Sequence, residues 1–157
     1  DALKDFPVKP ALAISLHTTF EDKRKKLLPR AGKITIEALV NQAEDYARAT
    51  GYPIQYQWTL MKGVNDGDDE LENIARLLQG KYALMNFIPV NAVKNSPFQR
   101  PEWSRCQEMA RYLKKSRILA KFRHSAAQDV EGGCGQLRAR HLSAAREAPI
   151  SLEKLDR

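Results

Sequence analysis

The sequence is short of cysteine and of long apolar runs, and each shortage excludes a class of protein. Its two cysteines, Cys106 and Cys134, lie in unlike contexts, so we expect no disulfide framework and a reducing, cytoplasmic setting. No Cys-x-x-Cys spacing occurs, so the residues alone predict no zinc or iron–sulfur site. No apolar run approaches the roughly 20 residues that cross a bilayer, and we expect no membrane contact.

Two further features are missing. The chain begins at Asp1 without a Met and without a signal-peptide pattern, which suggests a piece of a longer protein. No pair of carboxylates is spaced for acid–base work, and no Ser/His/Asp arrangement is visible.

Basic residues, in contrast, are plentiful. The 157 residues, 43% of them apolar, are enough for one domain with a core, and 26 Lys and Arg against 19 Asp and Glu give a net charge of +7. That balance favours polyanionic partners, with nucleic acid first. The basic run 23–26 fits either a solvated surface within a connector that extends to residue 30 or a contact with RNA phosphates.

The hydrophobic period alternates between that of strands and that of helices. This order predicts an α/β fold with a mainly parallel sheet. Thr35 is a plausible N-cap, Gly51 and Gly80 are plausible stops, and Pro101 can open the last helix. The pattern predicts strands over 11–17, 54–60, 82–88 and 118–123, and helices over 36–47, 71–78 and a stretch after 101 that buries Trp103, Cys106, Ala110 and Leu113.

The carboxyl ends of parallel strands meet at one edge of a sheet, where ligands bind. We therefore expect His17 and the segments 61–65, 89–91 and 124–125 to converge. Asn65 and Asp66 read as a structural turn pair. The aromatic side chains of the strands, Tyr56, Trp58 and Phe87, are expected in the core.

Cys134 lies between Gly133 and Gly135, in a segment without helical or strand period. Glycine neighbours leave a thiol accessible, whereas a cysteine kept for packing lies among apolar residues, as Cys106 does. Cys134 is therefore a candidate nucleophile, and the alternative is an incidental loop thiol. A thiol-redox role has little support, because no resolving cysteine lies at a suitable spacing.

Four short motifs stand in register along the chain: 12–17 (Leu-Ala-Ile-Ser-Leu-His), 62–66 (Lys-Gly-Val-Asn-Asp), 86–91 (Asn-Phe-Ile-Pro-Val-Asn) and 134–137 (Cys-Gly-Gln-Leu). In this order and spacing the chain resembles the C-terminal half of radical S-adenosylmethionine (radical-SAM) RNA methyltransferases of the RlmN/Cfr type. The resemblance covers about residues 12–137. Each motif alone is weak, and together they are specific.

The resemblance implies the C-terminal half of a partial (β/α)6 barrel over residues 1–124, followed by a loop-rich basic tail over 125–157. The family's 4Fe-4S cluster loop, Cys-x-x-x-Cys-x-x-Cys, and its resolving cysteine belong to the missing N-terminal half, and Cys106 does not match the latter. We expect the isolated chain to be inactive for that reason. An unpaired sheet edge favours association with the missing half or with a second copy.

Carried over by position, the resemblance implies a cofactor site for S-adenosyl-L-methionine that includes Ser15, Leu16, His17 and Asn91, and a methyl-accepting Cys134. In the family the cysteine takes one methyl group by displacement. Reductive cleavage of a second S-adenosylmethionine gives a radical that takes hydrogen from the S-methyl group. The resulting methylene radical adds to an adenine ring carbon of 23S ribosomal RNA. A disulfide between this cysteine and the resolving cysteine then releases the product. Transfer RNA is a further substrate that the sequence cannot separate from ribosomal RNA.

The chain departs from the family pattern on the substrate side. The usual Arg-Gly-x-Asp-Ile-x-Ala-Ala before the cysteine is replaced by residues 124–133, and the usual Asn-Pro is Asn91-Ala92. Arg138, Arg140 and Arg146 follow the cysteine and are candidate RNA contacts. The alternative function is a non-catalytic RNA-binding module, or an inactive fragment, whose basic tail does the binding.

Overall fold

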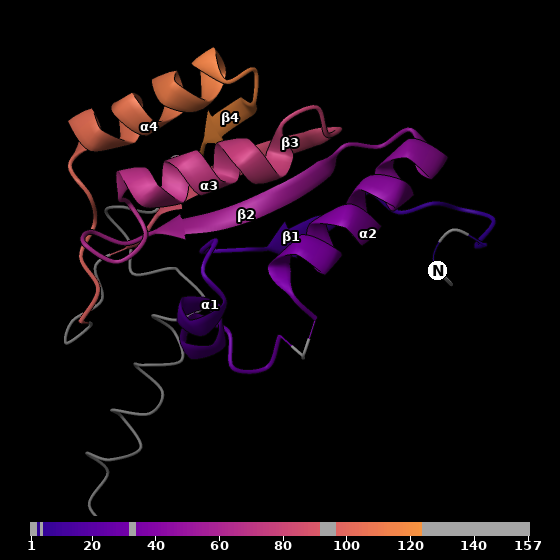
Figure 1. Ribbon diagram of the computed structural model, residues 1–157, viewed down its shortest axis with the longest axis horizontal. Coiled ribbons are helices and arrows are strands. Elements are labelled where there is room, and N and C mark those ends of the chain that lie inside the picture. Colours follow the sequence, from indigo (N-terminus) through magenta and orange to yellow (C-terminus); the bar gives the residue numbers. More distant parts are fainter. Residues whose placement is uncertain (1–2, 4, 32–33, 92–96, 124–157) are drawn as a thin grey trace, which may run out of the picture.

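A computed structural model describes residues 3, 5–31, 34–91 and 97–123, and Figure 1 shows their arrangement. The fold is α/β, with four parallel strands in the order β1-β2-β3-β4, as the alternating periods predict. The elements in chain order are β1 (Ala13–Ser15), α1 (Glu21–Leu27), α2 (Ile36–Thr50), β2 (Ile54–Leu60), α3 (Asp68–Leu78), β3 (Ala83–Pro89), α4 (Trp103–Lys115) and β4 (Leu119–Phe122).

The ends of α2 follow the sequence signals. The Thr35 hydroxyl accepts a hydrogen bond from the Ala38 N–H at 3.2 Å, which satisfies a donor that the first turn leaves unpaired. Gly51 ends the helix with φ of +76°, in the left-handed region that favours glycine. Both predicted boundaries are confirmed.

Helices α2, α3 and α4 lie over the same face of the sheet (Figure 1). The core lies between these two layers, and the burial of β2 alternates strictly between buried and half-buried side chains. The predicted aromatic core is confirmed, because Tyr56, Trp58 and Phe87 are at most 1% exposed. Within the described residues, no helix is long and apolar enough to span a membrane.

Two expectations about helices were wrong. The basic segment 23–30 is not all connector, because most of it forms α1, and Arg24 is buried in it. Trp103 is 42% exposed, because it occupies the first position of α4, and its ring makes an edge contact with Phe122. Met109 is buried in α4 beside Cys106 and Leu113, and Ala110 is only half-buried.

Candidate functional site

His17 is the second residue after β1 and lies at the carboxyl edge of the sheet. Its backbone has φ of +60°, a conformation that residues other than glycine rarely adopt. The imidazole Nδ1 accepts a hydrogen bond from the Thr59 N–H at 2.9 Å. This bond ties the side chain of His17 to the end of β2, so the ring orientation is fixed by the neighbouring strand.

The pKa of His17 is lowered from its ordinary value of 6.5, first by burial and second by the positive charge of Arg24. The ring is therefore neutral at pH 7. Because Nδ1 accepts a bond, a neutral ring carries its proton on Nε2. That N–H makes no hydrogen bond to another described residue, so it can donate to a ligand. Such a ligand would lie at the carboxyl edge of the sheet, which is called the rim below.

Asn65 is fully buried and joins the ends of two strands. Its Nδ2 donates to the carbonyl oxygens of His17 at 2.7 Å and Thr59 at 2.8 Å, and its Oδ1 accepts from the Met61 N–H at 2.8 Å. The structural interpretation of Asn65 is confirmed. Asn65 also holds the backbone of His17 in place through its bond to the His17 carbonyl oxygen, which the sequence did not reveal.

Glu70, in the first turn of α3, is a second anchor for the segment after β1, and sequence reasoning missed it. Its carboxylate is 0% exposed and accepts four hydrogen bonds. The donors are the Thr18 hydroxyl at 2.6 Å, the Thr19 N–H at 2.7 Å, the Thr19 hydroxyl at 2.6 Å and the Lys23 ammonium at 2.8 Å. The residues that follow His17 are thus fixed to the core through one buried charge.

Members of the basic run have different environments. Lys23 pairs with Glu70 and also donates to the carbonyl oxygen of Val64 at 2.8 Å. Arg24 is 6% exposed, and its buried Nε has no hydrogen-bond partner in the described part of the chain. Lys25 and Lys26 are exposed. Neither a solvated surface nor a phosphate contact fits the buried Arg24, and both interpretations stay open for the exposed Lys25 and Lys26.

Three of the predicted cofactor residues lie at the carboxyl edge of the sheet. Ser15 and His17 are at the end of β1, and Asn91 follows β3 two strands away. The Leu16 side chain is fully buried in the core, so a ligand can meet only the backbone of this residue. The predicted cysteine and arginines lie outside the described residues: Cys134, Arg138, Arg140 and Arg146.

Cys106 behaves as a core residue, as expected. It is fully buried in α4, and burial raises the pKa of its thiol. The described ranges contain no group of three His, Cys, Asp or Glu side chains that could hold a metal.

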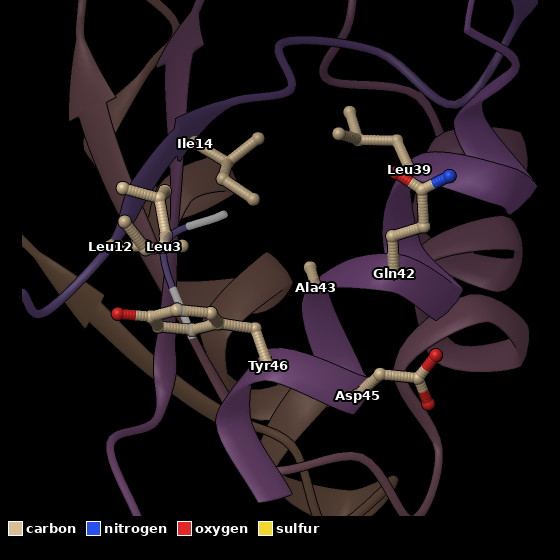
Figure 2. A pocket seen from close by; sticks show the side chains of 8 residues that line it. All are labelled: Leu3, Leu12, Ile14, Leu39, Gln42, Ala43, Asp45 and Tyr46. Atoms are coloured by element: carbon tan, nitrogen blue, oxygen red, sulfur yellow. The ribbon is translucent and has the colours of Figure 1, made fainter. Parts of the chain in front are cut away.

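A pocket of about 360 Å³ lies away from the rim, between α2 and the open side of β1. Figure 2 shows that its walls are largely apolar, with Leu12 and Ile14 on one side and Leu39 and Ala43 on the other, while the Tyr46 ring extends from α2 toward Leu12. None of the predicted site residues lines it. We interpret the pocket as a gap in the packing of α2 against β1, the first strand in the sheet order, and give it no role in ligand binding.

No family model matches the chain. A probable RNA methyltransferase of Methylibium petroleiphilum is 63% identical over 139 residues, which are 88% of this chain and 40% of the relative. A probable RNA methyltransferase of Aromatoleum aromaticum is 62% identical over 137 residues, 87% of this chain and 39% of the relative. The chain thus spans about two fifths of the length of these relatives.

Two solved structures share the fold. A radical SAM methyltransferase from Sphaerobacter thermophilus matches with a TM-score of 0.80 and 34% identity, over 86% of this chain and 40% of that chain. A domain of pyruvate-formate lyase-activating enzyme from Bacteroides vulgatus matches with a TM-score of 0.58 and 17% identity, over 73% and 67%, and this shows the fold alone. The α/β architecture therefore matches the fold of part of the Sphaerobacter thermophilus protein.

Proposed function

We propose that this chain is part of a radical SAM RNA methyltransferase of the RlmN/Cfr type. The enzyme methylates an adenine ring carbon in 23S ribosomal RNA, with transfer RNA as a second candidate substrate, through an S-methylcysteine on Cys134. The observation that carries the proposal is the 63% identity, over 88% of this chain, to a protein named a probable RNA methyltransferase. The structural match to a radical SAM methyltransferase supports the cofactor class.

The described residues fit S-adenosylmethionine at the rim. The Ser15 hydroxyl and the Nε2–H of His17 offer hydrogen-bonding groups to a polar ligand at the end of β1, and Asn91 lies after the end of β3 at the same edge. The lowered pKa of His17 has a use here, because a neutral imidazole does not repel a sulfonium cation. When bound, the cofactor supplies an electrophilic methyl group and the precursor of a radical.

The described residues do not fit a 4Fe-4S cluster. They contain no three-ligand group, and Cys106 is sealed in the core. Under the proposal the cluster ligands belong to another part of the enzyme, and this chain contributes none.

The chemical step assigned to this chain is a displacement at Cys134. The thiol would give its proton to solvent water, and the thiolate sulfur would attack the methyl carbon of S-adenosylmethionine. A new C–S bond would form as the bond from the methyl carbon to the sulfonium sulfur breaks, with S-adenosylhomocysteine as the leaving group. An ordinary thiol has a pKa of about 8.5 and is therefore mostly protonated at pH 7. The positive charge of an approaching sulfonium stabilises the thiolate, which is the reactive form.

The test uses a complete enzyme, in which this chain replaces the matching part of the Methylibium petroleiphilum relative. We expect Cys134→Ala to abolish both methyl labelling of the protein and methylation of ribosomal RNA, while RNA affinity changes less than twofold. Cys106→Ala is the matched control, because its sulfur is buried, and it should keep both activities. Unchanged methylation in Cys134→Ala would refute the mechanism.

The same enzyme tests the basic tail. Replacing Arg138, Arg140 and Arg146 by Gln should weaken RNA binding and reduce the slope of log affinity against log salt, because phosphate contacts release counterions. Transfer RNA and ribosomal RNA fragments are compared in parallel. An RNA affinity that is unaffected by all three changes would remove the tail from the RNA interface.

A further inference from the structure

The face of the sheet opposite the helices has an unusual composition for parallel strands. Parallel sheets are usually covered on both faces and read as continuous apolar runs. In β2, however, Gln55, Gln57 and Thr59 alternate with the buried core residues and are half-buried. No described helix covers this second face (Figure 1). The same face carries Ala13, Leu84 and Leu119 at the level of Gln55, so its polar part is confined to one level of the sheet.

One row of side chains crosses this face at a single level. The strand register aligns Ser15 with Gln57, Gln57 with Asn86, and Asn86 with Lys121. Neighbouring strands lie about 4.8 Å apart, so the row spans about 14 Å, a length that suits a nucleoside with a substituent.

The two central amides have hydrogen-bonding capacity to spare. Asn86 is 5% exposed, and its Nδ2 donates to Gln55 Oε1 at 3.3 Å, a contact that leaves other positions of the amide available. The side-chain amide of Gln57 makes no hydrogen bond to another described residue. Two adjacent amides thus present donors and acceptors side by side to whatever lies on the sheet.

We propose that Gln57 and Asn86 extend the cofactor site and hydrogen-bond the adenosine part of S-adenosylmethionine. The inference rests on the proposed function, which assigns Ser15 to that cofactor. A ligand that touches Ser15 is within reach of its register neighbour Gln57. Amide side chains match the paired donor and acceptor on the edge of adenine.

The charge at the end of the row sets the direction of the ligand. Lys121 is exposed on β4, two strands away from Gln57. Its ammonium repels the sulfonium, which therefore lies toward Ser15 and the neutral His17, and the base lies toward Asn86. This orientation leaves the methyl group at the β1 side of the rim.

The experiment measures the affinity of the complete enzyme for S-adenosylhomocysteine by calorimetry. We expect Gln57→Leu and Asn86→Leu each to weaken binding by about tenfold, the effect of losing one hydrogen bond at a desolvated site. If the Asn86→Leu variant does not fold, Asn86→Asp replaces it, because this change keeps the size of the side chain and removes the amide donors. The matched control is Gln107→Leu, an exposed glutamine of α4, which should bind as the unsubstituted enzyme does.

The outcomes separate this inference from the proposed function. If the unsubstituted enzyme binds S-adenosylhomocysteine and the row variants bind it equally well, the row is not part of the cofactor site and only this inference falls. If the variants lose RNA affinity but keep S-adenosylhomocysteine affinity, the amides contact the substrate nucleotide, which also overturns the inference. If the unsubstituted enzyme fails to bind S-adenosylhomocysteine, the proposed function falls and the inference with it.

Discussion

Replacing Glu70 by Ala is the sharpest test of how the rim is held together. The carboxylate is fully buried and accepts four hydrogen bonds from Thr18, Thr19 and Lys23. Its removal leaves the Thr18 hydroxyl without its acceptor and the Lys23 ammonium without its counter-charge, with only the Val64 carbonyl oxygen as a remaining acceptor. The segment directly after His17 then loses its main link to α3.

The magnitude follows from the burial of the two charges. Removing one member of a buried ion pair costs about 3–5 kcal/mol. Lys23 keeps 31% of its side-chain surface in solvent, which screens its charge, so we expect the lower half of that range, about 3–4 kcal/mol. Glu70→Gln keeps the volume and one acceptor oxygen and should cost about 2 kcal/mol.

The assay is urea unfolding of the 157-residue chain, followed by the fluorescence of the buried Trp58. With a slope of about 2 kcal/mol per molar urea, Glu70→Ala should lower the midpoint by about 1.5–2 M. Glu72→Ala, an exposed glutamate on the same helix, should change the free energy of unfolding by less than about 0.5 kcal/mol. Equal effects of the two substitutions would refute the anchoring role of Glu70.

Two further predictions concern single groups, and a third concerns the whole chain. The imidazole of His17 should titrate below pH 6.5 by NMR, and Arg24→Met should raise its pKa, because a neighbouring positive charge is lost. As pH falls through 6.5, His17 is protonated in the unfolded state before it is protonated in the folded state, so its contribution to the free energy of unfolding should decrease. A measured folded-state pKa at or above 6.5 would contradict this prediction. Cys106 should react with a thiol reagent only after unfolding, and rapid labelling in native Cys134→Ala would show that its burial is wrong. The isolated 157-residue chain, given reductant, S-adenosylmethionine and ribosomal RNA fragments, should transfer no methyl group, and measurable transfer would contradict the assignment of the cluster to another part of the enzyme.

Local signals predicted most of the fold. The alternation in β2 and the capping pair Thr35 and Gly51 act over a few residues, so they can be read in one dimension. The basic run was misjudged because charge composition does not reveal a partner that lies far along the chain. Lys23 and Glu70 are 47 residues apart in the sequence, and only the fold brings their charges together.

The candidate site divides in the same way. The chain order and spacing of the motifs are sufficient to place Ser15, His17 and Asn91 at the strand ends, because parallel strands point their carboxyl ends to one edge. The sequence could not show that Asn65 bonds the backbone of His17, nor that Gln57 and Asn86 stand side by side. Such relations depend on the register between strands, which is set by how the helices pack against the opposite face.

The amino-acid order by itself thus determined the strand and helix periods, the solvent-shielded aromatic stripe and the sequence motifs of the rim, since these depend on neighbours within a few positions. Only the tertiary structure decided which charges are buried, which ring nitrogen of His17 carries the proton and which polar side chains share a level on the sheet. The reason is that burial, hydrogen-bond partners and register are properties of segments distant in sequence, and they exist only once those segments have packed.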